Sequence, residues 1–262
     1  MSRHPSETSA SASSSNMQDP DAAPTTLEFI IRQLNAVLRH VQEAERLPVW
    51  LTQDTAMMAR AAETSRTIFA NLISLSATRP ALAAAMKGRF LDAGVGDGAL
   101  VIAAADRCPD LKIVGLDVWE PAVATAREKV ALSSHADRIQ LRLQDMTQIV
   151  EREAFSLIWL PSPFLPKSAA PSALDRLTLA LRPNGYLVIG RYAPPPGDCD
   201  ARLGSLEVMR SSSQCWESGA LVDCLRERGF RDIETHPGPP NVELTLGRRS
   251  AVRNPAGLGA SA

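Results

Sequence analysis

Apolar residues recur at helical spacing from the N-terminal region to about residue 88. Positions 27, 30, 31, 34, 37, 38 and 41 are all Leu, Ile or Val, the spacing of an amphipathic helix. Thr25 and Glu28 fit a capping box at its start, and Pro48 ends it because the residue before a proline avoids the helical region. Further helices are predicted over about 54–75 and from Pro80 to near Gly88. Residues 25–88 are therefore predicted to form a helical cap.

From Arg89 onward, short apolar runs alternate with helical patterns. Strands alternating with helices imply right-handed crossovers and a parallel, doubly wound α/β sheet. The last two predicted strands are joined by a turn too short for a helix, so they should pair antiparallel, giving one antiparallel edge strand. The predicted strands are 90–94, 111–117, 138–144, 155–160, 185–192, 231–236 and 242–249, and the helices are about 97–107, 120–132, 172–181 and 214–228. The expected fold is a seven-stranded, mostly parallel sheet.

Both ends of the chain are polar and lack a core-forming pattern. Residues 1–24 contain seven serines and no large apolar residue besides Met1 and Met17, so they cannot offset the entropy of ordering and are predicted to be disordered. Residues 250–262 are a second loose tail. The predicted organisation is a 1–24 tail, a 25–88 cap, an 89–249 sheet domain and a 250–262 tail.

Composition narrows the class of protein. The 262 residues suffice for a sizeable core, and a net charge of −1 gives no reason to expect a duplex nucleic acid or an anionic membrane as partner. No apolar run is long enough to span a bilayer, and the N-terminus has no apolar segment typical of a secretion signal. The four cysteines lack CxxC spacing, so a cytoplasmic protein with reduced thiols is expected, with no metal site.

The most informative motif is a glycine-rich turn between the strand at 90–94 and the following helix. Gly94, Gly96 and Gly98 have GxGxG spacing, and Asp92 lies two residues before the first glycine. A dinucleotide pyrophosphate is typically bound by GxGxxG at a helix N-terminus, and a carboxylate at position 92 would repel it. The same carboxylate suits an ammonium group. The motif therefore argues against a nicotinamide cofactor and for one that carries an amino acid.

Two more acids lie where the next two predicted strands end. Asp117 lies 19 residues after Gly98, where a carboxylate can accept hydrogen bonds from both ribose hydroxyls. Asp145 follows the third strand and could accept a hydrogen bond from an adenine amino group. A single acid of this kind is compatible with a helix cap or a solvated loop, but three at successive strand ends favour a nucleoside site.

Together these residues resemble the class I S-adenosylmethionine-dependent methyltransferase superfamily, in its bacterial small-molecule or natural-product type. The similarity covers about 89–249 and rests on LDAGVGDG (91–98), GLDVWEPAVATAREKV (115–130), LQDM (143–146) and FSLIWLPSPF (155–164). The resemblance implies S-adenosylmethionine as cofactor. It assigns Asp92 and the three glycines to the methionine part and Asp117 to the ribose. It further assigns Val118 or Trp119 and Asp145 with Met146 to the adenine, and Leu160 to the region of the sulfonium.

The acceptor side carries weaker signals. Pro161-Ser162-Pro163-Phe164 resembles the [DNS]-P-P-[YF] motif of methyltransferases that act on planar nitrogens. It departs from that motif in the leucine before the first proline and the serine between the prolines, so a rigid substrate-pocket loop is favoured. His40 in the cap and Tyr192 at the end of the fifth strand are the candidate catalytic residues.

The predicted function is methyl transfer from S-adenosylmethionine to a small-molecule acceptor, in specialised metabolism, with residues 25–88 as a lid. The alternatives are a methyltransferase acting on RNA or protein, a cofactor-binding subunit without activity of its own and, more distantly, a nicotinamide enzyme. Pairing through the N-terminal helices would give a homodimer. Neither a nucleic acid nor a membrane is expected as partner.

Overall fold

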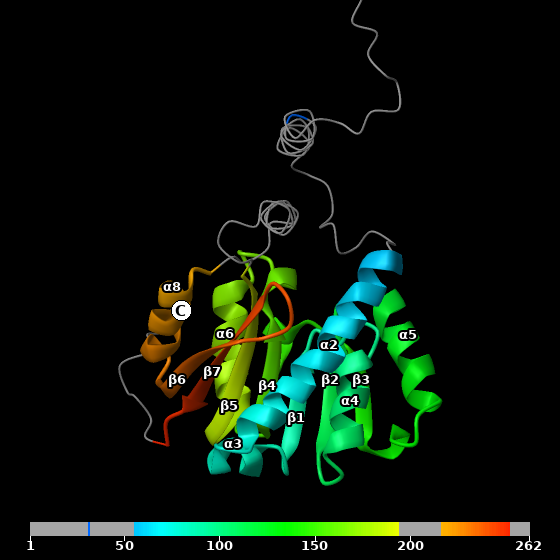
Figure 1. The fold of residues 1–262 in the computed structure, drawn as a ribbon, viewed down its shortest axis with the longest axis horizontal. Helices are drawn as coiled ribbons and strands as arrows, with labels where there is room; N and C mark the ends of the chain where they lie inside the picture. The colour runs from blue at the N-terminus through cyan, green and yellow to red at the C-terminus, as the bar shows by residue number, and fades with distance from the viewer. Residues whose placement is uncertain (1–30, 32–54, 194–215, 252–262) are drawn as a thin grey trace, which may run out of the picture. The chain divides into compact units, whose positions relative to one another are not determined.

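The computed structural model of the chain describes residue 31 and residues 55–193 and 216–251 (Figure 1). Within 55–193, side chains are described from residue 63 onward. All of these except residue 31 lie in the larger of two compact units, which spans 45–262. The predicted first cap helix with His40, the tail at 1–24 and nearly all of the tail at 250–262 lie outside the described residues.

A single sheet of seven strands forms the centre of the described part. The strand order is β3-β2-β1-β4-β5-β7-β6, and the pairs from β3 to β5 are parallel. The strands are β1 (Arg89–Ala93), β2 (Lys112–Asp117), β3 (Ile139–Leu143), β4 (Phe155–Pro161), β5 (Leu181–Tyr192), β6 (Phe230–Pro237) and β7 (Val242–Arg249). The predicted doubly wound α/β fold is confirmed.

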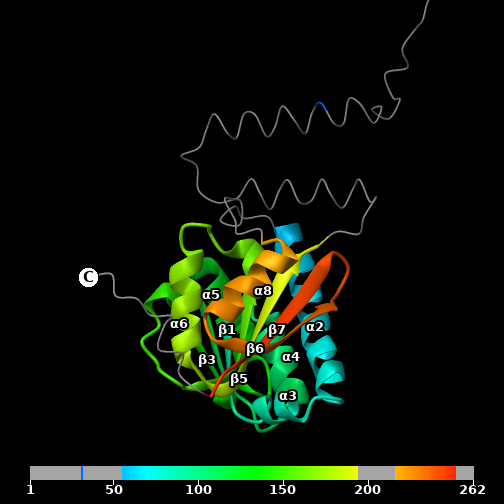
Figure 2. The same cartoon turned by 90° about the vertical axis from the view of Figure 1, so that its left-hand side faces the viewer.

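Helices cover both faces of this sheet (Figures 1 and 2). Their apolar residues form two core clusters, one on each face. The first face carries α2 (Thr55–Ser76), α3 (Pro80–Ala85), α4 (Ala99–Arg107) and α5 (Glu120–Ala131), and the second carries α6 (Ala170–Ala180) and α8 (Ser218–Glu227). Three short 3₁₀ turns complete the described elements: η2 (Ala136–Arg138), η3 (Met146–Gln148) and η4 (Ser162–Phe164).

Two local predictions were wrong. The antiparallel strand β7 is not at the edge of the sheet: it lies between β5 and β6, and β6 forms the edge. After β5 the chain passes through α8 and places β6 one strand away from β5. The short turn after β6 then reverses the chain, so that β7 pairs with both β5 and β6. In addition, Leu181 begins β5 rather than ending α6, since Arg182 precedes Pro183 and a residue in that position avoids the helical region.

The described part of the predicted cap packs into the core of the sheet domain. Phe69 and Leu72 of α2 are completely buried, and the Phe69 ring lies 6.0 Å from the Phe90 ring of β1. Arg79, between α2 and α3, donates to Glu234 of β6 at 2.6 Å. These residues therefore stabilise the sheet domain. A lid over the acceptor, and a dimer through the N-terminal helices, stay predictions.

Residues 55–193 and 216–251 contain no helix with the length and apolar character needed to cross a membrane. In the same ranges no three His, Cys, Asp or Glu side chains are grouped so that they could hold a metal ion. Cys108 and Cys224, the two cysteines in these ranges, are free thiols. Burial raises the pKa of both, so neither is activated as a thiolate.

Candidate cofactor-binding site

The glycine turn connects the end of β1 to the start of α4. Gly94, Gly96 and Gly98 have φ angles of +143°, +52° and +84°, values that side chains with a Cβ rarely adopt. A Cβ on Gly94 would lie 2.8 Å from Cγ of Pro161 at the end of β4, whereas a Cβ on Gly96 would meet nothing within 4 Å. Gly94 thus allows close packing against β4, and Gly96 borders open space that a ligand can occupy.

Asp117, at the end of β2, ties this turn to the neighbouring strand. Its Oδ2 accepts from the backbone N–H of Gly96 at 3.0 Å, and its Oδ1 accepts from the N–H of Trp119 at 3.0 Å. Burial raises the pKa of Asp117, although the backbone donors oppose that effect. The structure therefore brings together the glycines and the second predicted acid.

Asp97 and Lys129 form a second tie that sequence reasoning did not single out. Asp97 accepts from the N–H of Ala99 at 3.1 Å through Oδ1, and from Nζ of Lys129 at 2.5 Å through Oδ2. Lys129 lies on α5, and the backbone of Ala126 on the same helix packs against Gly98. The position of Asp97 before a helix signals a cap, but no local pattern points to a partner 32 residues away.

Asp92 is the least exposed acid of the site. Its side chain is 1% exposed, and Oδ1 has no hydrogen-bond partner. Burial, and then the charges of Asp117 and Asp97, raise the pKa of Asp92 well above its ordinary value. A buried carboxylate with an unused oxygen beside two other acids favours the approach of a cationic group.

The environment of Asp92 predicts that Asp92→Asn stabilises the protein at pH 7. Because folding raises the pKa of Asp92, the unfolded chain loses this proton at a lower pH than the folded protein does, so stability falls as the pH rises from the unfolded-state pKa to the folded-state pKa. Removing the charge should therefore increase the free energy of unfolding at pH 7. The gain should shrink as the pH approaches 4, where wild-type Asp92 is itself protonated.

Urea unfolding of wild type and variant at pH 7 and pH 5 measures this difference. Asp110→Asn is the matched control, since Asp110 is exposed. A loss of stability in Asp92→Asn at pH 7 would show that the ionised carboxylate is well accommodated and would contradict the prediction.

The remaining predicted cofactor residues lie in different surroundings. Val118 is 50% exposed at the end of β2 and Trp119 is half-buried, so both are available for contact. Asp145 accepts from the N–H of Thr147 at 2.8 Å through Oδ1, which caps η3, and Met146 packs partly against the core. The side chain of Leu160 is completely buried in the core on the α6 side, and the following residue, Pro161, lies against Gly94. The assignment of Leu160 to the region of the sulfonium stays a prediction.

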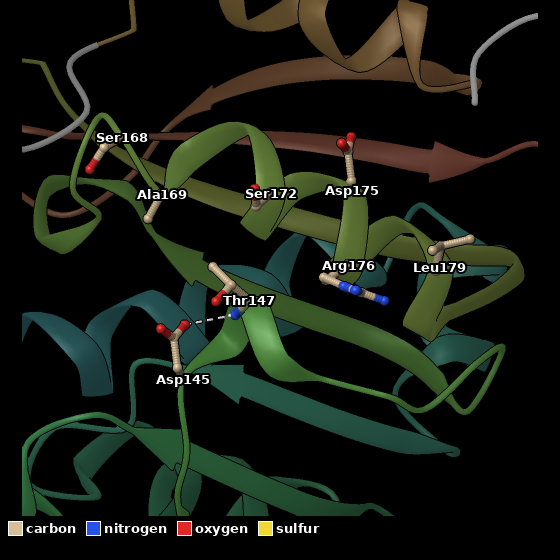
Figure 3. Close-up of a pocket in the computed structure, with 8 residues that line it drawn as sticks. All are labelled: Asp145, Thr147, Ser168, Ala169, Ser172, Asp175, Arg176 and Leu179. Carbon is tan, nitrogen blue, oxygen red and sulfur yellow. Dashed lines mark hydrogen bonds between the residues drawn. The ribbon is translucent and has the colours of Figure 1, made fainter. Parts of the chain in front are cut away.

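A groove of about 620 Å³ lies beside Asp145, between η3 and α6 (Figure 3). No residue of the glycine turn lines this groove, so the groove meets the candidate cofactor site only at Asp145. Its lining residues are Asp145, Thr147, Ser168, Ala169, Ser172, Asp175, Arg176 and Leu179.

The Pro161–Phe164 segment lies against the glycine turn, as the contact with Gly94 shows. Ser162 is buried and its Oγ has no hydrogen-bond partner, while Phe164 in the same 3₁₀ turn is 44% exposed. Tyr192, the described one of the two catalytic candidates, is half-buried at the end of β5. The sequence indicated that this segment lies near the site, but it did not show that Ser162 is buried while Phe164 is exposed.

Comparison with known proteins identifies the class. Residues 90–185 match the methyltransferase-domain family. The chain is 26% identical over 181 residues to release factor glutamine methyltransferase of Caulobacter vibrioides, which covers 64% of this chain and 60% of that protein. It is 36% identical over 122 residues to tRNA1(Val) (adenine(37)-N6)-methyltransferase of Bacteroides thetaiotaomicron, covering 46% and 51%. The chain thus spans about half to three fifths of the length of these relatives.

The fold is shared with human N-acetylserotonin methyltransferase, solved in complex with SAM. The TM-score is 0.58 at 19% identity, covering 84% of this chain and 67% of that one. The match of residues 90–185 to the methyltransferase-domain family and the shared fold support the resemblance to the class I S-adenosylmethionine-dependent superfamily.

Proposed function

We propose that the protein binds S-adenosylmethionine at the glycine turn and transfers its methyl group to a small-molecule acceptor. The observation that carries the proposal is the hydrogen bond from Gly96 N–H to Asp117 beside the open space at Gly96. This hydrogen bond holds the glycine turn, which has room for a ligand, beside the Asp117 carboxylate, which can accept hydrogen bonds from ribose hydroxyls. The buried, unpartnered oxygen of Asp92 fits the ammonium group of the same cofactor.

Each part of the cofactor has a candidate partner in this arrangement. Asp92 would hold the methionine ammonium directly or through water, and Asp117 would accept from the ribose hydroxyls. The exposed side chain of Val118 offers an apolar surface for the adenine ring. Asp145 lies where it could accept from the adenine amino group, with its second carboxylate oxygen, since Oδ1 is used by Thr147.

When bound, S-adenosylmethionine supplies a methyl group already activated by positive sulfur. The glycine turn and Asp117 would hold this cofactor so that its methyl group could pass to an acceptor nucleophile, with the sulfonium as leaving group. The residues of this chain then act mainly by orientation and by excluding water. Gly94 and Pro161 set the distance between the turn and β4, and Phe164 presents an aromatic surface to an acceptor at that strand end. Tyr192 is the candidate for proton removal.

The small-molecule acceptor is supported by the net charge of −1, which gives a polyanion no general attraction. N-acetylserotonin methyltransferase, named for a small acceptor, shares the fold. The second candidate is an RNA or protein acceptor, and it is favoured by the names of the two curated relatives.

Incubation of the full chain with methyl-labelled S-adenosylmethionine and a fractionated metabolite extract should place the label in a small molecule, identified by mass spectrometry. A rate that changes little with salt is expected, because a small acceptor releases few counterions on binding. Transfer only to RNA or protein, with steep salt dependence, would replace the small acceptor by the second candidate. If the purified chain binds S-adenosylhomocysteine yet transfers no methyl group to any fraction, it is a cofactor-binding subunit.

A further inference from the structure

On the sheet face that carries α6 and α8, the described part of the chain supplies no α-helix between β3 and β4. The connection from β3 to β4 contains only the three-residue turn η3, where the expected pattern of a doubly wound sheet has a helix. Gln140 on β3 and Lys112 on β2 are accordingly exposed, and Arg142 is partly so. A groove of about 300 Å³ lies at the amino end of these strands, at the sheet edge opposite the glycine turn.

Basic residues from three neighbouring strands meet in this groove. Arg89 of β1 is the register partner of Lys112 of β2, and Arg138 immediately precedes Ile139, the register partner of Ile113. Neighbouring strands are about 4.8 Å apart, so the three residues form a continuous row. All three line the groove, with Gln140 and with Asp137 at the end of the row.

Contacts with the protein fix two side chains of this row, Arg89 and Arg138. The Arg89 guanidinium lies 4.7 Å from the centre of the Phe155 ring, an attractive cation–π contact. Arg138 donates to the carbonyl oxygens of Ala105, Cys108 and Leu111, which end α4 and the turn after it. Ordering of these two side chains therefore does not depend on a ligand.

Donors in the groove are left without acceptors. Within residues 63–193 and 216–251, neither Nζ of Lys112 nor the Arg89 guanidinium has a hydrogen bond or an ion pair. Gln140 accepts from Arg142 at 3.0 Å through its carbonyl oxygen, so its amide N–H groups remain as donors. Three donor groups from three strands thus line one groove.

Positive charge exceeds negative charge around the groove. The nearby acids are Asp137 and Glu151, and Glu151 is already paired with Arg142 at 2.6 Å. Although burial raises the pKa of Glu151, the hydrogen bond from Arg142 and the charges of Arg142 and Arg89 lower it overall. Among the residues that line the groove, Arg89, Lys112 and Arg138 are cations and Asp137 is the one acid.

We propose that this groove, lined by Arg89, Lys112, Arg138 and Gln140, is a binding site for a phosphate group, separate from the cofactor site. A phosphate offers several acceptor oxygens and at least one negative charge, which match a guanidinium, an ammonium and an amide donor in one groove. Arg89 and Ala93 are the first and last of the five residues of β1, so the two sites are roughly 13 Å apart at about 3.3 Å per residue. The phosphate is therefore carried by a second ligand, either a free phosphorylated molecule or a nucleic-acid backbone.

Calorimetric titration of the full chain with pyrophosphate at low ionic strength tests the site. Lys112→Gln should weaken binding at least tenfold, and Lys112→Arg should retain it because the charge remains. Arg226→Gln is the control, since Arg226 is an exposed cation on α8. Binding of S-adenosylhomocysteine to Lys112→Gln should equal that of wild type, which separates this site from the proposed function.

A parallel titration with a short labelled single-stranded RNA distinguishes the two sources of phosphate. RNA binding that Lys112→Gln also weakens assigns the site to a nucleic-acid backbone, and pyrophosphate binding without RNA binding assigns it to a free phosphorylated molecule. The proposal is overturned if wild type binds neither probe, or if Arg226→Gln weakens binding as much as Lys112→Gln.

Discussion

Asp117→Ala should remove nearly all of the thermal stabilisation that S-adenosylhomocysteine gives the wild-type protein. The variant loses the acceptor of the Gly96 N–H and, in the proposed complex, the acceptor of both ribose hydroxyls. Hydrogen bonds to a charged group contribute about 1.5–3 kcal/mol each, so affinity should fall about 100-fold or more. At a ligand concentration 100 times the wild-type Kd, ligand stabilisation would decrease from about 2.7 to about 0.4 kcal/mol.

The unliganded variant should nevertheless remain folded. Burial raises the pKa of Asp117, which means that the fold does not favour its ionised form, and alanine relieves that cost. Thermal unfolding with and without S-adenosylhomocysteine measures both effects, with Asp110→Ala as an exposed control.

Two failures of this experiment can be told apart. If wild type itself shows no shift with S-adenosylhomocysteine but does with NAD, the proposed cofactor is wrong. If wild type shifts and Asp117→Ala shifts equally, only the ribose role of Asp117 is refuted.

Phe69→Ala should destabilise the protein by about 3–5 kcal/mol, the cost of removing a large buried aromatic side chain. Phe69 is completely buried on α2 and its ring contacts that of Phe90 in β1. For a domain of this size, each kcal/mol lowers Tm by about 2–4 °C, so a decrease of roughly 10 °C is expected.

Arg66→Ala on the same helix is the matched control for Phe69→Ala. The Arg66 side chain is 54% exposed and pairs with Glu63 one turn away, so its loss should change stability by less than about 0.5 kcal/mol. A decrease below about 1 kcal/mol for Phe69→Ala in calorimetry would mean that α2 is a detachable cap and not part of the core.

Much of the fold was predictable because its signals are local. Alternation between apolar runs and helical spacing located all seven strands, and the glycines with Asp92 located the turn after β1. Parallel strands place their carboxyl ends at one edge, so Asp117 was expected beside the turn, and the Gly96 hydrogen bond shows that it is. The sheet edge illustrates the limit: antiparallel pairing of the last two strands was predicted, but which of them pairs with β5 depends on contacts distant in the chain.

The sequence by itself determined the order and type of the elements, the glycine turn and the acids at the carboxyl ends of β1, β2 and β3. These follow from residue periodicity and from the backbone preferences of single residues. Only the tertiary structure decided that α2 belongs to the core, that β7 lies inside the sheet, and that Asp97 meets Lys129. The row of Arg89, Lys112 and Arg138 likewise appears only once three strands are in register. In each case the deciding contacts join residues distant in the chain, and no local pattern encodes which of them pack together.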